Sequence, residues 1–408
     1  MFTKAFRLGK IEIVVKIHII VRMSDRKEGT MDRIEKYIDE LMEKSTPDRP
    51  IWNIEKILQG LKSNWNYIDG CMIKAILEMY AITKDEKYFQ FADAFIDAKV
   101  REDGTIEGYD VNELNIDNVN AGKTLFELYD LTGKEKYRKA IDLIYSQIQL
   151  MPRTKEGNFW HKNIYPNQVW LDGLYMCHPF YMEYETRYNN KKNYDDIYNQ
   201  FFNVVKNMRD ERTGLYYHAY DESREMFWCD KVTGLSANYW LRASGWYMMA
   251  LLDTLDKADK TDVEPYEKLK KIFVDYVDAM LRYQDESGMW YQVINLGGMD
   301  RNYLETSGSS IMAYALLKGV RLGLLSESYA AYGKKAFDGI VKTRLTTDEQ
   351  GDLHLDGICL VAGLGGKDMR DGTYEYYMSE PVVKDDAKGV GPFLLAYTEM
   401  RRAGLLDA

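Results

Sequence analysis

Residues 242–252 read R-A-S-G-W-Y-M-M-A-L-L, a helical stretch that is apolar on nearly every side. A helix of this kind must be buried all round, whereas a surface helix keeps one polar face. The helix expected next along the chain, over residues 264–283, is charged on one face. The sequence therefore predicts an inner helix, from residues 237–256, that pairs with an outer helix.

The same pairing recurs along the chain. Hydrophobic periodicity predicts further pairs at residues 70–82 with 85–98, 119–131 with 134–150, 172–188 with 191–208, and 307–323 with 326–342. Single helices are expected over residues 31–45, near 52–62 and over 387–403. Most outer helices are followed by a polar residue, a glycine and a short alternating run; these glycines are Gly104, Gly157, Gly214, Gly288 and Gly351.

The unpaired helices at the two ends of the series indicate a sixth unit. Six helical hairpins form an open solenoid or a closed toroid, and inner helices that are apolar all round favour the toroid. The predicted fold is all-α, an (α/α)6 barrel with short β-hairpins in loops at one mouth, and it spans residues 29–408 as one domain. Residues 1–28 are interpreted as an extension: an extra strand, an adventitious segment or a disordered tail.

Composition and charge limit the partners. The chain is 46% apolar and 29% charged, as in a soluble globular protein, and its formal net charge of -10 argues against nucleic acid and anionic membranes as partners. The four Cys form no C-x-x-C pair and are expected to be reduced in a cytoplasmic protein. No metal-ligand spacing is present, so neither a metal nor a cofactor is predicted. The 32 Tyr suit a cleft for a hydroxylated ring, or simply an aromatic core.

The N-termini of parallel inner helices gather at one mouth of such a barrel. Segments rich in Asp, Asn, Trp, Tyr and Gly precede these helices, at residues 64–70, 112–123, 168–173, 235–246, 302–310 and 379–391. Helix capping explains one Asp, Ser or Asn in each segment, but it does not explain the Trp, Arg and paired Gly. We therefore expect a shared cleft there, which suits a carboxylated ligand because helix N-termini bind anions.

Asp172 is the leading candidate for a catalytic acid or base. It directly precedes an apolar helical run and has Trp170 and Tyr175 as sequence neighbours. An Asp at a helix start also caps the helix or complements its dipole, and capping is the commoner interpretation. Aromatic walls favour the catalytic role, because they favour the protonated form of a carboxyl group.

Three further residues are candidates for ligand contacts. His161 and His218 each lie four residues after a repeat glycine, and Gln292 occupies the equivalent place in a third repeat. A lone His is usually structural, but a matched pair beside aromatic residues indicates a site. Arg242 is the candidate partner for a ligand carboxylate, because a guanidinium group forms two parallel hydrogen bonds with it.

Several motifs together resemble the unsaturated rhamnogalacturonyl hydrolases, relatives of the unsaturated glucuronyl hydrolases. They are N-I-D-N-V-N-A-G-K, F-W-H-K, V-W-L-D-G-L-Y-M, L-Y-Y-H-A-Y-D, R-A-S-G-W, E-T-S-G-S-S and D-D-A-K-G-V-G-P-F. The resemblance covers residues 31–405 and implies an (α/α)6 barrel. It also implies roles for eight residues: Asp172 as general acid/base, Asp117 as its supporting acid, and His161, His218, Arg242, Trp246, Trp170 and Tyr67 as substrate contacts.

The resemblance implies hydration of the C4=C5 double bond in an unsaturated uronic acid, at the non-reducing end of a lyase-generated rhamnogalacturonan disaccharide. The expected partner is thus a small oligosaccharide that carries a carboxylate. Three alternatives stay open: an unsaturated glucuronyl hydrolase acting on glycosaminoglycan fragments, an inverting glycosidase acting on saturated oligosaccharides, and a non-catalytic sugar-binding toroid. Loop residues, including 356–384, select the second sugar, which the sequence leaves unidentified together with the oligomeric state.

Overall fold

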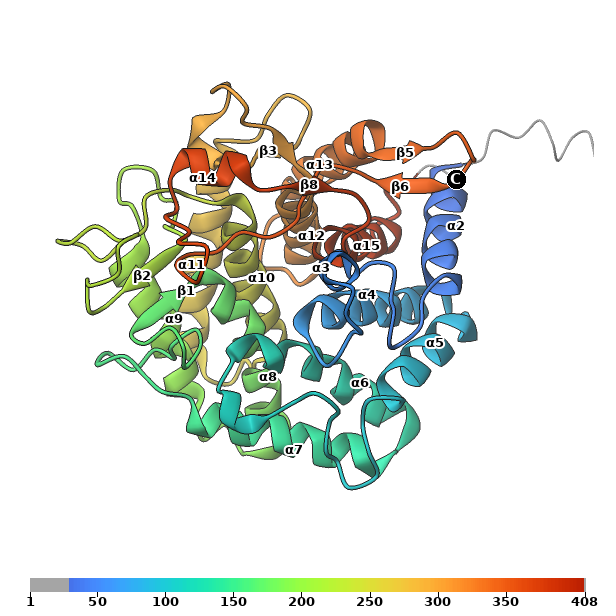
Figure 1. The fold of residues 1–408 in the computed structure, drawn as a ribbon, viewed down its shortest axis with the longest axis horizontal. Helices are drawn as coiled ribbons and strands as arrows, with labels where there is room; N and C mark the ends of the chain where they lie inside the picture. Colours follow the sequence, from blue (N-terminus) through green and yellow to red (C-terminus); the bar gives the residue numbers. More distant parts are fainter. Residues whose placement is uncertain (1–28, 407–408) are drawn as a thin grey trace, which may run out of the picture.

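The computed structural model describes residues 29–406, so the extension expected at residues 1–28 lies outside the described residues. Within the described residues, six inner helices form a closed ring in which each contacts the next and the last returns to the first. They are α4 (Tyr67–Thr83), α6 (Lys123–Thr132) with the 3-10 turn η2 (Ile116–Gly122) before it, α8 (Leu171–Tyr188), α10 (Leu241–Lys257), α12 (Thr306–Arg321) and α15 (Ala387–Arg402). The predicted (α/α)6 barrel is confirmed (Figure 1).

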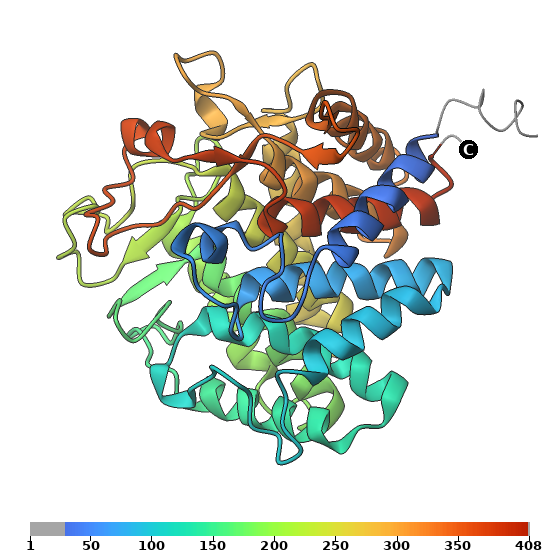
Figure 2. The same ribbon diagram turned by 45° about the vertical axis from the view of Figure 1, so that its right-hand side comes forward.

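The outer layer pairs with the inner ring. Helices α5 (Glu86–Asp97), α7 (Glu135–Leu150), α9 (Tyr194–Met208), α11 (Val263–Leu281) and α13 (Tyr329–Arg344) pack on the inner helices that precede them. Helix α2 (Thr30–Glu43) covers α15, as expected from the two unpaired end helices (Figure 2). There Tyr397 donates a hydrogen bond to Glu35 at 2.9 Å, and Arg401 pairs with the same carboxylate. A short helix, α3 (Ile54–Gln59), leads into α4.

One inner helix begins later than its apolar pattern predicts. The pattern starts at residue 237, but α10 starts at Leu241. The backbone before it is extended, because Trp240 forms a bridge with Val293 and the Leu241 N–H donates to the carbonyl of Gln292 at 2.9 Å. Pairing with the neighbouring repeat therefore replaces the first helical turn.

Short antiparallel strands join neighbouring loops at the mouth of the barrel. The pairs are β1 (Gln168–Trp170) with β2 (Ala219–Asp221), β3 (Trp290–Tyr291) with β4 (Leu304–Glu305), β5 (Leu345–Thr347) with β6 (Leu353–Leu355), and β7 (Ile358–Cys359) with β8 (Val382–Val383). The five repeat glycines all have positive φ, between 73° and 99°, a conformation that favours glycine. The glycine repeat is therefore a turn signal, as the pattern predicted.

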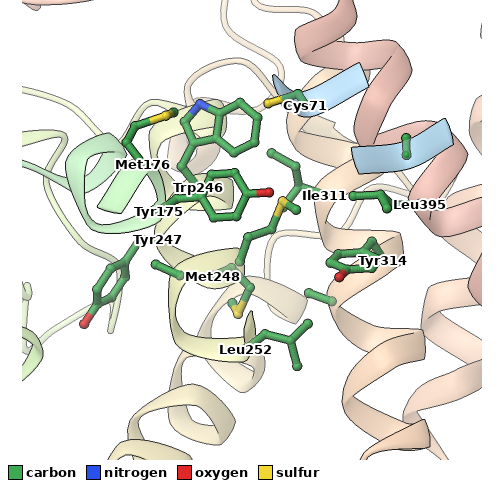
Figure 3. Close-up of a cluster of buried hydrophobic side chains, with 14 of the residues drawn as sticks. Cys71, Tyr175, Met176, Trp246, Tyr247, Met248, Leu252, Ile311, Tyr314 and Leu395 are labelled. Carbon is green, nitrogen blue, oxygen red and sulfur yellow. The ribbon is translucent and has the colours of Figure 1, made fainter. Parts of the chain in front are cut away.

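Aromatic and apolar side chains fill the middle of the barrel. Trp246 of α10 stacks on Tyr175 of α8, with ring centroids 4.9 Å apart and planes 5° apart (Figure 3). Trp246 and Met176 line a cavity of about 230 Å³ at the end where the inner helices begin. Tyr175, Tyr314 and Leu395 line a second cavity, of about 270 Å³, toward the opposite end. The stacked pair therefore forms part of the partition between two cavities.

Among residues 29–406, no helix combines the length and the apolar character that crossing a membrane requires.

Candidate functional site

The cavity at the N-terminal ends of the inner helices brings the predicted residues together. Seven of the eight line it: Tyr67, Asp117, His161, Trp170, Asp172, Arg242 and Trp246. The eighth, His218, is fully buried directly behind Asp172. The shared cleft that the sequence predicted at this mouth is therefore present.

Asp172 is the second residue of α8, but it does not cap the helix. The N-cap is Trp170, and no side chain forms a capping hydrogen bond at this helix start. Oδ2 of Asp172 is buried and has no hydrogen-bond partner within the described residues. The capping interpretation of Asp172 is therefore wrong, because the carboxyl group faces the cavity instead of the backbone.

Asp69 shows what a structural carboxylate looks like at the matching place in α4. It also precedes a glycine at an inner-helix start, yet its oxygens accept hydrogen bonds from Trp52 Nε1 at 3.1 Å, Ser63 Oγ at 2.5 Å and Asn66 Nδ2 at 2.8 Å. A carboxylate with these partners is fully engaged in holding the fold. Within the described residues, no such donors hold Asp172 Oδ2, so the fold does not engage this carboxyl group in the same way.

His218 is the nearest polar neighbour of Asp172. Its Nε2 lies 3.2 Å from Asp172 Oδ2, and its Nδ1 lies 2.7 Å from the hydroxyl of Tyr377 in α14 (Tyr374–Ser379). The pairing of Trp170 with Ala219 in β1 and β2 brings the imidazole beside the start of α8. His218 therefore links Asp172 to Tyr377, a residue that the repeat pattern does not reach.

Asp117 lies in η2 and is paired with a cation. Lys162 Nζ is 2.7 Å from its Oδ2, and His161 Nε2 is 3.6 Å from its Oδ1. Burial alone would raise the pKa of Asp117, but the charge of Lys162 and the proximity of His161 outweigh it and lower that pKa. Burial lowers the pKa of His161 to about 4, against the attraction of Asp117. At neutral pH Asp117 is therefore ionised and His161 is neutral.

Aromatic rings form one wall of the cavity. The His161 imidazole stacks on Trp170 at 4.4 Å, and the Tyr165 ring stacks on Trp170 at 5.3 Å. A Cβ atom at Gly173 would lie 3.0 Å from His161 Nδ1, so this glycine lets the imidazole pack against the start of α8. Flat apolar faces with polar edges are the surfaces on which sugar rings pack. Tyr67, half-buried at the start of α4, also lines this cavity.

Arg242 lines the cavity, but its guanidinium group is largely engaged by the protein. Nη1 donates to Ser307 Oγ at 3.3 Å and to the carbonyl of Cys359, and Nη2 donates to the carbonyl of Leu360 at 3.3 Å. Its carbon atom Cζ lies 4.7 Å from the centre of the Trp240 ring. Arg242 therefore supplies a fixed positive charge to the cavity, with few donors left for a ligand.

The cavity residues and neighbours that were not predicted include Lys162, Tyr165, Arg370 and Tyr377. Lys162 directly follows His161 in the F-W-H-K motif, and Tyr165 lies four residues beyond His161, so the motif itself was the signal. Arg370 and Tyr377 come from the segment between β7 and β8, which contains α14 and carries no repeat pattern. In the part of the chain that the structure describes, no three His, Cys, Asp or Glu side chains converge as metal ligands.

Known proteins share this sequence and architecture. The sequence profile of Glycosyl Hydrolase Family 88 matches residues 33–403. A solved structure of a family 105 glycoside hydrolase from C. acetobutylicum ATCC 824 is 46% identical, with a TM-score of 0.82 over 90% of this chain and 99% of that chain. The unsaturated rhamnogalacturonyl hydrolase YesR of Bacillus subtilis is 27% identical over 283 residues, which are 68% of this chain and 75% of that protein.

More distantly related solved structures share the fold. The unsaturated glucuronyl hydrolase from Bacillus sp. GL1 is 14% identical, with a TM-score of 0.60 over 84% of this chain and 87% of that chain, and so shares the fold. The family profile covers nearly all of the described residues, and the family 105 structure matches almost end to end. The chain therefore belongs to glycosyl hydrolase family 88 and is a glycoside hydrolase.

Proposed function

We propose that this glycoside hydrolase releases the 4,5-unsaturated uronic acid from the non-reducing end of lyase-generated rhamnogalacturonan disaccharides. The observation that carries the proposal is the carboxyl group of Asp172: its Oδ2 has no hydrogen-bond partner within the described residues, and it faces a cavity lined by Asp117, Arg242 and aromatic rings. The 27% identity to a relative named as an unsaturated rhamnogalacturonyl hydrolase supports this substrate class.

The reaction begins at a vinyl ether, because the double bond joins C4 to C5 and C5 carries the ring oxygen. Asp172 protonates C4, and the resulting positive charge spreads over C5 and the ring oxygen. A water molecule adds to C5 and gives its proton to the Asp172 carboxylate, which restores the acid. The hemiketal then opens to a ketone at C5, and the hemiacetal left at C1 collapses to an aldehyde and expels the neighbouring sugar.

The other site residues serve this step by position and charge. Asp117 is ionised at neutral pH, so it accepts hydrogen bonds from ring hydroxyl groups, and its negative charge stabilises the positive charge at C5. Lys162 holds Asp117 in place, and His218 orients Asp172. Arg242 attracts the uronate carboxylate through its fixed charge, and Trp170, Trp246, His161 and Tyr67 surround the ring.

The four free, buried Cys support the expected cytoplasmic location. We further expect the natural partner to be a small oligosaccharide, because the cavity volume of about 230 Å³ suits a ligand of few sugar rings.

A substrate panel tests the function. Unsaturated disaccharides from rhamnogalacturonan, heparin and chondroitin are incubated with the purified protein, and loss of the ultraviolet absorbance of the conjugated double bond is recorded. The rhamnogalacturonan disaccharide should lose its absorbance fastest, and its saturated counterpart should remain intact. Cleavage of the saturated compound would instead indicate an inverting glycosidase, and preference for a sulfated disaccharide would indicate a glucuronyl hydrolase.

A further inference from the structure

Two guanidinium groups line the catalytic cavity, and they differ in how far the protein buries them and engages their N–H donors. Arg242 is buried to 1% exposure, and both of its Nη atoms donate to protein oxygens. Arg370 lies on the segment after β7, is half-buried and lines the same cavity. The Nη donors of Arg242 are therefore engaged by the protein, whereas Arg370 is more exposed.

The position of Arg370 is fixed by a turn made of glycines. Its Nε donates to the carbonyl of Gly365 at 3.2 Å, and the two residues also exchange backbone hydrogen bonds of 2.8 and 3.2 Å. A Cβ atom at Gly363 would lie 2.7 Å from Nη1, and one at Gly366 would lie 3.2 Å from Nη2. The absence of a Cβ atom at Gly363 and Gly366 leaves room for the guanidinium group beside the main chain, and the Nε hydrogen bond to Gly365 restrains it there.

The two Nη atoms of Arg370 have no protein partner within residues 29–406. Neither donates a hydrogen bond there, and no carboxylate oxygen lies within 4 Å of them. The charge of Arg370 acts to lower the pKa of Glu380, but burial outweighs it and raises that pKa. The two groups form no ion pair. Lys162, the remaining cation of the cavity, is already paired with Asp117. A free, fixed guanidinium fork is the group that binds a carboxylate through two parallel hydrogen bonds.

Contacts between neighbouring rings lead from Asp172 to Arg370. His218, beside Asp172, meets the Trp170 ring edge-on at 5.5 Å, and Trp170 stacks on Tyr165 at 5.3 Å. A Cβ atom at Gly366 would lie 3.7 Å from the Tyr165 hydroxyl and 3.2 Å from Arg370 Nη2, so these two polar groups flank the same glycine. A sugar chain whose unsaturated ring is at Asp172 therefore leads along Trp170 and Tyr165 toward Arg370.

We propose that Arg370 binds a carboxylate on the leaving-group side of the substrate, so that the protein favours fragments in which a second uronate follows the first neutral sugar. In rhamnogalacturonan, where galacturonate and rhamnose alternate, this is the tetrasaccharide. The proposal rests on the proposed function for the position of the unsaturated ring. It assigns to Arg370 a different carboxylate from the one attracted by Arg242.

The test compares the unsaturated disaccharide and tetrasaccharide as substrates for the wild type, Arg370→Gln and Gly363→Ala. Arg370→Gln should raise KM for the tetrasaccharide about tenfold, the effect of one charge-assisted contact near the surface, with kcat unchanged and the disaccharide affected less than about twofold. Gly363→Ala should do the same, because the added Cβ would lie 2.7 Å from Arg370 Nη1 and so displaces the guanidinium group from this position. Lys367→Gln, an equal change of charge at an exposed position of the same loop, should leave both substrates unaffected.

An unchanged ratio of tetrasaccharide to disaccharide KM in Arg370→Gln would overturn the proposal. A calorimetric titration with the leaving trisaccharide alone, rhamnosyl-galacturonyl-rhamnose, separates this outcome from failure of the proposed function, because it needs no turnover. The wild type should bind the trisaccharide about tenfold more tightly than Arg370→Gln. Equal binding by the two proteins would overturn the assignment even if neither unsaturated substrate were hydrated.

Discussion

Oδ2 of Asp172 lies 3.2 Å from Nε2 of His218, and both atoms are buried without a well-directed hydrogen bond in the described part of the chain. The other imidazole nitrogen is held by Tyr377 at 2.7 Å. His218 is therefore fixed from behind and limits the movement of the carboxyl group. This arrangement suits a positioned acid better than a helix cap.

Replacing His218 by Ala should lower kcat about 100-fold, because a catalytic group that shifts by about 1 Å loses roughly this factor. Initial rates of absorbance loss measure the effect. Tyr377→Phe, which removes only the hydroxyl group behind the imidazole, should cause a smaller loss. A wild-type kcat in His218→Ala would contradict the positioning role.

Replacing Lys162 by Met should move the acidic limb of the kcat/KM pH profile to higher pH. Without the charge of Lys162, only His161 opposes the effect of burial, which raises the pKa of Asp117. That pKa therefore rises, and Asp117 becomes protonated at a higher pH as the solution is acidified. Rates measured across the acidic range reveal the shift. An unchanged acidic limb would show that ionised Asp117 is not required.

The same variant should show a pH-dependent loss of stability. A carboxyl group whose pKa is lowered in the folded state stabilises the fold above its unfolded pKa, and this stabilisation disappears as the pH falls through the folded-state value. The wild type should therefore exceed Lys162→Met in urea midpoint at neutral pH and lose that advantage below about pH 4. A difference that grows on acidification would contradict the sign of the shift.

Replacing Asp69 by Ala should destabilise the protein by about 3 kcal/mol, because the donors of Trp52, Ser63 and Asn66 lose their buried acceptor. Urea unfolding of this variant and of Asp172→Asn gives the comparison, since Asp172 has no such donors. Equal stability of Asp69→Ala and the wild type would mean that the hydrogen bonds of Asp69 contribute little.

Replacing Gly173 by Ala should lower kcat/KM about tenfold while the protein stays folded. The added Cβ would lie 3.0 Å from His161 Nδ1, so the imidazole must move away from Trp170 and Asp117; crowding of this size costs about 1–3 kcal/mol. Steady-state rates and thermal unfolding together check the effect. Wild-type kinetics would show that the stacked His161 is not needed for substrate binding.

The periodic features of this fold were predictable from the sequence. Inner helices are apolar all round because they are covered on both sides, and the repeat glycines are required by positive φ. Both causes act locally, so they leave a local pattern. For the same reason the helix starts, and with them Asp172 and Asp117, could be assigned to one mouth.

The partners of each side chain were not predictable, because they come from distant parts of the chain. Asp69 and Asp172 precede a glycine in the same way, and only the tertiary structure shows that Asp69 is engaged by Trp52. Gln292, which aligns with the two histidines, instead accepts a hydrogen bond from Trp240 at 3.1 Å. Arg242, whose guanidinium group was expected to bind a ligand carboxylate, instead donates hydrogen bonds to the carbonyls of Cys359 and Leu360.

Turnover by Asp172→Asn tests the central claim most directly, because the amide keeps the shape of the side chain but cannot donate the proton to C4. The loss of ultraviolet absorbance of the unsaturated disaccharide should slow by about 1,000-fold or more, while the thermal unfolding curve stays that of the wild type. Near-wild-type loss of absorbance in the purified variant would contradict the role of Asp172 as the general acid.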